Sequence, residues 1–130
     1  MDDDIRETNR QSRIERIGKG WLRNRITVVE AEAKHLTDFS LGDDKSEFAQ
    51  RLHAGRLKLA RSWSVPLDGK PVPFGFANRQ WREMVASMQE GDELWEFSNS
   101  DDAWQHLAGR AGIALVRNGE IVDCILTSMN

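Results

Sequence analysis

A two-residue turn signal, Asn118-Gly119, constrains the fold of this chain more than any other feature of its sequence. Asn and Gly both accept the positive φ that a type I′ turn needs at its two central positions, and this turn joins adjacent antiparallel strands. Apolar runs flank the turn on both sides, so we predict a β-hairpin of residues 112–117 and 120–127. A two-residue loop also fixes the register, which pairs Arg117 with Glu120, Leu115 with Val122 and Ile113 with Cys124.

The predicted register divides the hairpin into two faces. We expect the first face to meet the helices, because it is apolar apart from an ionic pair at the tip. Cys124 lies on this face and is the only cysteine of the chain. We therefore expect a buried, unreactive thiol, with no internal disulfide and no Cys-based zinc site. The first face carries Ile113, Leu115, Val122, Cys124 and Leu126, and the second carries Ala114, Val116, Ile121 and Asp123.

Before the hairpin, the clearest pattern is amphipathic and predicts a helix over residues 79–90 with Asn78 as its N-cap. Residues 92–97 then predict a strand with Trp95 and Phe97 on one face, and residues 101–109 predict a short helix. The stripe of the first helix consists of Trp81, Met84, Val85 and Met88.

A second long helix is predicted over residues 45–63, opened by a capping box of Asp44 and Glu47. We expect its large apolar side chains to form the buried face. Its flank is basic, and no acidic residue follows Glu47 until Asp68. The apolar side chains are Phe48, Leu52, Leu59 and Trp63, and the basic ones are Arg51, Lys58 and Arg61.

Two segments keep alternative interpretations. Thr27 and Glu30 match a capping box for a helix over about residues 28–39 that aligns Val29, Ala33 and Leu36. The β-branched residues 26–29 equally predict a strand over residues 26–30. Residues 65–73 hold all three prolines. They are either a linker or a β-hairpin-like excursion over the core.

Residues 1–25 are predicted to form a charged, mobile arm. Seven basic and two acidic residues lie between Ile5 and Arg25. Ile14, Ile17 and Trp21 have helical spacing, but the stripe is too narrow to support a core, so we expect a helix that orders on a partner.

These patterns predict an α+β fold with a helix-rich N-terminal half packed on a small antiparallel sheet that includes the C-terminal hairpin. At 130 residues, the chain has room for one core, so residues 26–130 are expected to form a single domain. An acidic start without an apolar segment, and no long apolar run, predict a cytoplasmic protein that does not enter a membrane.

The sequence contains no motif specific enough to name a reaction, a cofactor or a metal site. Its three histidines are far apart and match no metal-ligand spacing. The best candidate base is His106, which lies near Ser100, Asp101 and Asp102 and one turn before Arg110. A small enzyme centred on His106 is therefore one hypothesis, and an exposed helix face with a capping cluster is the simpler interpretation.

The leading hypothesis is a non-catalytic regulator that binds another protein, such as an adaptor, an inhibitor or an immunity-type protein. Charge asymmetry supports it, as does a tryptophan content too high for one small core, which predicts one or two exposed indoles. The alternative is a nucleic-acid-associated protein that uses its Arg-rich arm. The predicted partner-binding residues are Arg10, Arg13, Arg16, Trp21, Arg51, Lys58, Arg61 and Trp63.

Overall fold

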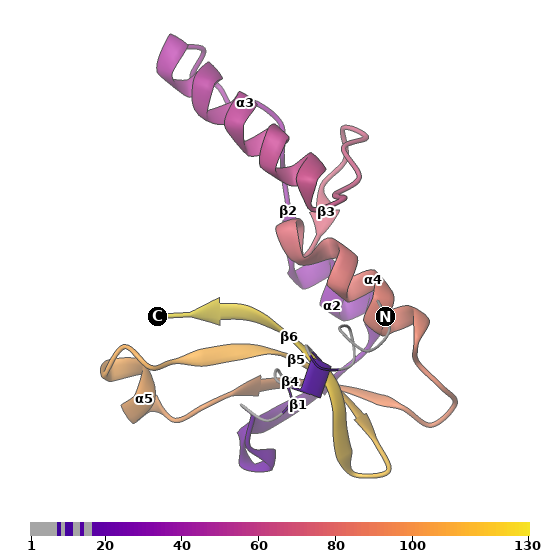
Figure 1. The fold of residues 1–130 in the computed structure, drawn as a ribbon. Coiled ribbons are helices and arrows are strands. Elements are labelled where there is room, and N and C mark those ends of the chain that lie inside the picture. Colours follow the sequence, from indigo (N-terminus) through magenta and orange to yellow (C-terminus); the bar gives the residue numbers. More distant parts are fainter. Residues whose placement is uncertain (1–7, 9, 12–13, 15–16) are drawn as a thin grey trace. The chain divides into compact units, whose positions relative to one another are not determined.

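The structure is a computed structural model that describes Thr8, Arg10, Gln11, Ile14 and residues 17–130 (Figure 1). The described chain divides into two compact units. The sheet unit contains the N-terminal segment up to Val28 together with Met84–Asn130, and the helical unit contains Val29–Glu83. This division does not test the prediction of one domain over residues 26–130.

The sheet unit is built on a four-stranded antiparallel sheet in the order β1-β4-β5-β6 (Figure 1). A 3-10 turn, η1, precedes β1, and the short helix α5 connects β4 to β5. The bounds are Lys19–Trp21 for η1, Leu22–Ile26 for β1, Glu93–Ser98 for β4, Asp101–Gln105 for α5, Arg110–Arg117 for β5 and Glu120–Met129 for β6.

The helical unit holds helices and one short two-stranded ladder, in which β2 pairs antiparallel with β3. Helix α2 begins at the last residue of the sheet unit, and α4 ends within the sheet unit. The bounds are Val28–Lys34 for α2, Leu36–Thr37 for β2, Glu47–Ser62 for α3, Val72–Pro73 for β3, Gly75–Ala77 for the 3-10 turn η2 and Asn78–Ala86 for α4.

This architecture confirms the α+β class and the antiparallel sheet with a C-terminal hairpin. A helix-rich N-terminal half is confirmed only in part, because this half of the sequence contains the strands β1 and β2 as well as the helices α2 and α3. Within the described part of the chain, no helix combines the length and the apolar character that crossing a bilayer requires.

The hairpin turn is as predicted, since Asn118 has φ 53° and Gly119 has φ 79°. Arg117 lies opposite Glu120 in the ladder, as expected, but the register predicted beyond the tip is wrong. Val116 pairs with Ile121 and Leu115 pairs with Asp123, so Val122 is an extra residue in β6. Such a bulge shifts every following residue to the opposite face, which a strict two-residue alternation cannot anticipate.

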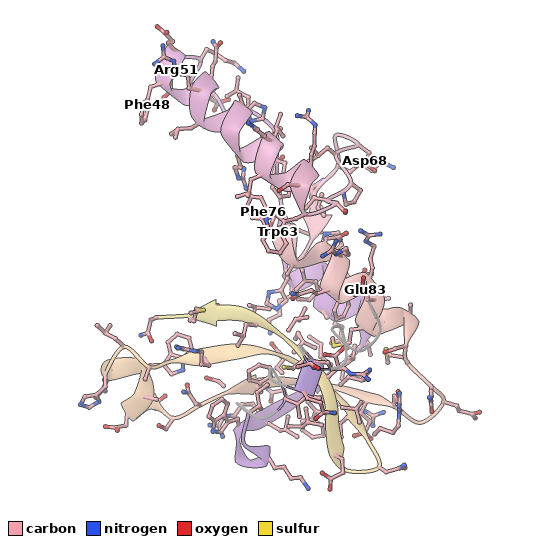
Figure 2. The ribbon with its side chains drawn as sticks, viewed as in Figure 1. Phe48, Arg51, Trp63, Asp68, Phe76 and Glu83 are labelled. Atoms are coloured by element: carbon pink, nitrogen blue, oxygen red, sulfur yellow. The ribbon has the colours of Figure 1, made fainter. Side chains whose placement is uncertain are left out.

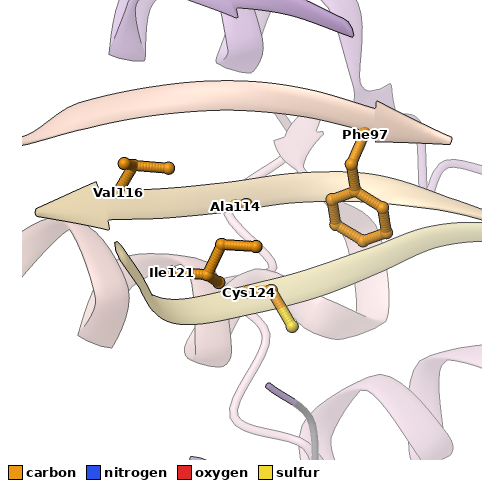
Figure 3. Packing of buried hydrophobic residues seen from close by; sticks show 5 residues of the cluster. All are labelled: Phe97, Ala114, Val116, Ile121 and Cys124. Carbon is orange, nitrogen blue, oxygen red and sulfur yellow. The ribbon is translucent and has the colours of Figure 1, made fainter. Parts of the chain in front are cut away.

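The bulge therefore places Cys124 on the face of β6 opposite to the predicted one. It packs in one cluster with Phe97, Ala114, Val116 and Ile121 (Figure 3). Burial of Cys124 is confirmed, and so is the alternation in β4, because Trp95 packs against the same cluster as Phe97. The other face is buried too, through Leu94, Ile113, Leu115 and Ile125.

The N-terminal stripe corrects another expectation. Ile14, Ile17 and Trp21 pack against the cluster around Phe97, together with Leu22. The prediction that this stripe supports no core is therefore wrong for these side chains. The rest of the arm falls largely outside the described residues.

In the helical unit, both alternatives left open by the sequence are resolved. Residues 28–34 are helical, but α2 buries Ala31 and leaves Val29 exposed, which corrects the predicted stripe. The proline-containing connection packs on α3, because Val65 and Val72 share a buried cluster with Phe39 and Ala60.

Helix α4 confirms the predicted stripe in part: Trp81 and Met84 are almost fully buried, Val85 is half-buried, and Met88 lies beyond the end of the helix at Ala86. Asn78 is not its N-cap but its first residue, preceded by η2. The Asn78 side chain instead donates to the Pro73 carbonyl oxygen at 2.9 Å and accepts from Arg82 Nε at 2.7 Å. It thereby ties the helix to the end of β3.

Candidate functional site

Helix α3 carries the surface that stands out as a candidate site, and its start is fixed by local hydrogen bonds. The N-cap is Ser46, whose hydroxyl accepts from the Ala49 backbone N–H at 3.1 Å. Asp44, predicted as the cap, lies two residues earlier and accepts from the Ser46 N–H at 2.9 Å. This hydrogen bond lowers the pKa of Asp44.

One side of α3 is anchored in the helical unit. Ala60 is fully buried, and Leu57 packs against the cluster that contains it. The guanidinium of Arg56 lies 4.6 Å from the centroid of the Phe39 ring, and its Nη1 donates to the Asp38 carbonyl oxygen at 3.0 Å. These contacts fix which side of the helix faces outward.

The outward side carries the large apolar residues that the sequence placed in the core. Phe48 is 71% exposed, Leu52 60%, Leu59 50% and Trp63 46%. Figure 2 labels Phe48 and Trp63 at the two ends of this row. Successive spacings of four, seven and four residues put these side chains on one side of the helix. The prediction that they form the buried face is wrong, because Leu57 and Ala60 take that role. Trp63 confirms that an indole is exposed.

Gly55 lies within this stripe, seven residues after Phe48, and a Cβ built there meets no atom within 4 Å. We call Phe48, Leu52, Gly55, Leu59 and Trp63 the α3 face. Other exposed large apolar residues lie elsewhere, such as Val29 on α2 and Leu107 in the connection between α5 and β5. Single exposed apolar residues are ordinary on a protein surface, whereas a row of four on one helix is typical of an interaction site.

The charges of α3 are strongly biased. Its sixteen residues hold four basic side chains, Arg51, Arg56, Lys58 and Arg61, and one acidic side chain, Glu47. Arg51 and Lys58 flank the α3 face on the side opposite to Arg56. Arg51 forms an exposed ion pair of 2.6 Å with Glu47, one turn earlier.

The structure groups some of the predicted binding residues and separates others. Arg51, Lys58 and Trp63 lie on or beside the α3 face. Arg61 lies on the same helix but lines a cavity of about 230 Å³ together with His53 and Leu57. The sequence analysis did not predict Phe48, Leu52 and Leu59 as binding residues. Their position on a helix with almost no acidic residues was the feature that could have indicated it.

The remaining predicted residues belong to the sheet unit or lie outside the described chain. Trp21 is half-buried against the Phe97 cluster. Arg10 lines a cavity of about 380 Å³ with Arg117 and Asp123, among others. Arg13 and Arg16 lie outside the described residues.

His106 is the C-cap of α5, and its side chain is 72% exposed. Its Nδ1 lies 2.8 Å from the Asp102 carbonyl oxygen and 3.5 Å from Asp102 Oδ1. The Ser100 hydroxyl accepts from the Ala103 N–H as the N-cap of the same helix. The cluster predicted around His106 thus has a capping geometry, and His106 lines neither of the two cavities described above.

Among the described residues, no three His, Cys, Asp or Glu side chains converge as ligands of a metal ion would. Comparison of the chain with protein families, with curated proteins and with solved structures finds no match. The surface chemistry of α3 is therefore the basis for a functional proposal.

Proposed function

We propose that this protein acts by binding another protein through the α3 face, as a small adaptor, inhibitor or immunity-type regulator would. The observation that carries the proposal is a row of four exposed large apolar side chains along α3: Phe48, Leu52 and Leu59 on the helix and Trp63 at its C-cap. Aromatic residues and arginine are the residues most enriched in binding hot spots, and the α3 face ends in Phe48 and Trp63 with Arg51 beside it.

Physical magnitudes support a binding role over a structural one. Full burial of a Leu or Phe side chain contributes roughly 1.5–3 kcal/mol, so covering four half-exposed side chains provides several kcal/mol. The anchoring contacts of Arg56 and Ala60 hold the helix in place from its other side, so binding needs little reordering.

Site-specific photo-crosslinking tests this proposal. A photoreactive phenylalanine analogue is placed at Leu52 or, as a matched control, at Val29, which is also exposed and lies on α2 of the same unit. In cells that naturally make the protein, we expect a discrete crosslinked partner from position 52 only. Leu59→Asp in the same chain should abolish that product. Equal products from both positions would refute the proposal.

A nucleic-acid role remains the alternative, and an oligonucleotide measurement separates it. Fluorescence anisotropy with labelled single- and double-stranded oligonucleotides at low salt should show no binding that depends on Leu52 or Leu59. Binding that falls steeply with salt and depends on Arg10 would favour the nucleic-acid alternative instead.

A further inference from the structure

The shape of the α3 face restricts what can cover it. The stripe is one side chain wide and about four helical turns long, running from Phe48 to Trp63. Gly55 contributes no side chain in its middle, and the space that a Cβ would occupy there is open. A narrow row of apolar side chains with a glycine between them is the geometry onto which a second helix packs.

The edges of the stripe restrict the charge of that helix. Arg51 and Lys58 lie two turns apart on one edge, and both are exposed. On the other edge, Arg56 is held against Phe39. Glu47 pairs with Arg51 at 2.6 Å, but it is the sole acidic residue of α3 against four basic ones, so the borders of the stripe keep a net positive charge. A helix with acidic residues along its sides is therefore attracted, and a basic one is repelled.

A second copy of this chain fits the apolar row but not the charges. In an antiparallel pair, Phe48 would face Trp63 and Leu52 would face Leu59, but Arg51 would then lie beside Lys58 of the second copy. In a parallel pair, Arg51 would lie beside Arg56 of the second copy. Like charges across a helix pair are destabilising and select against that pairing.

We propose that the α3 face binds an amphipathic helix of a partner protein, whose apolar stripe is bordered by Asp or Glu residues. This inference rests on the proposed function and adds the chemistry of the partner. Phe48, Leu52, Leu59 and Trp63 supply the affinity, and Arg51 and Lys58 select the partner and speed its association. Exposed ion pairs contribute little affinity by themselves, so the two roles are separable by mutation.

Three fluorescein-labelled synthetic helical peptides serve as probes with the full-length protein. All share one apolar stripe of Leu and Phe at helical spacing, and their flanking positions carry Glu in the first, Lys in the second and Gln in the third. We expect the Glu peptide to bind at least about tenfold more tightly than the Lys peptide at low salt, with the Gln peptide between them. The difference should shrink as the salt concentration rises.

Variants assign the effect to residues. Arg51→Glu combined with Lys58→Glu should reverse the order of the Glu and Lys peptides. Leu52→Asp should weaken the binding of all three. Lys70→Glu is the matched control, because Lys70 is exposed in the same unit but lies on the proline-containing connection, and it should leave the order unchanged. Circular dichroism of each variant confirms that its helix content is retained.

Each remaining outcome overturns the inference. Equal affinity for the Glu and Lys peptides would show that the flanking charges do not select the partner. A concentration-dependent dimer in sedimentation would assign the α3 face to a second copy of the chain. Binding to anionic phospholipid vesicles that Leu52→Asp abolishes would assign it to a membrane surface. If crosslinking from position 52 captures a partner while the peptides do not discriminate, the proposed function stands and the acidic helix is wrong. If crosslinking fails as well, the proposed function is wrong.

Discussion

Arg117 holds both carboxylate oxygens of Asp92, with Nε 2.9 Å from Oδ1 and Nη2 2.8 Å from Oδ2. The Gln89 N–H also donates to Asp92 Oδ2, at 2.8 Å. These contacts join the end of β5 to the segment between α4 and β4. The sequence predicted an ionic pair of Arg117 with Glu120 instead, but Glu120 pairs with Lys19 at 2.7 Å.

The Arg117–Asp92 pair predicts a pH-dependent stability. The Arg117 side chain, with the Gln89 N–H, lowers the pKa of Asp92 from 3.8 to about 2. A carboxyl whose pKa is lowered on folding stabilises the fold above its unfolded pKa, and this contribution is lost as the pH falls toward the folded pKa. We therefore expect Asp92→Asn to lower the melting temperature near neutral pH and to have little effect at about pH 2.

Glu120→Gln is the control for this prediction. It removes an exposed pair from the same hairpin, and exposed pairs contribute little stability. If both variants lowered the melting temperature equally at neutral pH, the Arg117–Asp92 pair would not have the stabilising role assigned to it.

Gly112 is predicted to be irreplaceable within β5. A Cβ at this position would run into the backbone carbonyl of Ile125 and the ring of Phe97. Gly112→Ala should therefore destabilise the protein by roughly 1–3 kcal/mol, measured by urea unfolding. Gly55→Ala is the contrasting variant, because that position is open, and it should stabilise an exposed helix by about 1 kcal/mol. Equal effects at both positions would contradict the strand packing.

The hairpin shows which features can be predicted from sequence. Its turn depends on the φ preferences of two adjacent residues, Asn118 and Gly119, so local chemistry suffices. The bulge at Val122 has no such signal, because Val is an ordinary strand residue. The bulge lets Ile121 and Cys124, three residues apart, pack in one cluster, whereas a regular strand would place them on opposite faces. The turn was therefore predictable, and the register beyond it was not.

Helix α3 shows the same limit at the candidate site. Its sequence contains two apolar rows, one with Phe48 and Leu59 and one with Leu57 and Ala60. Periodicity favours burial of the row with the larger side chains. The structure buries the smaller row, because Ala60 allows close packing with Phe39 and Val65. That choice depends on the residues opposite the helix, which one sequence pattern does not contain.

In the helical unit, Trp81 is predicted to contribute through a hydrogen bond as well as through packing. Its Nε1 donates to Glu32 Oε2 at 3.0 Å, and its ring lies 4.3 Å from that of Phe74. Trp81→Phe keeps most of the packing and loses the hydrogen bond, so it should cost about 1–3 kcal/mol. In a double-mutant cycle, Glu32→Ala and Trp81→Phe should be less than additive. Strict additivity would show that the hydrogen bond contributes nothing.

The N-terminal segment provides the last prediction, since the packing of Trp21 reverses the expectation drawn from its sequence. A mobile arm would be removable without effect, whereas Ile14, Ile17 and Trp21 pack against the cluster of Phe97 and Cys124. Trp21→Ala should therefore destabilise the fold by about 1–3 kcal/mol, as loss of a partly buried aromatic does.

Two further measurements make this prediction specific. The thiol of Cys124 should react with DTNB faster in Trp21→Ala than in the parent protein, because both residues belong to the same cluster. Trp63→Ala is the matched control, since it removes an exposed indole from the helical unit and should change neither the stability nor the thiol reactivity. If Trp21→Ala changed neither the stability nor the thiol reactivity, the N-terminal segment would not contribute to the core, as the sequence analysis predicted.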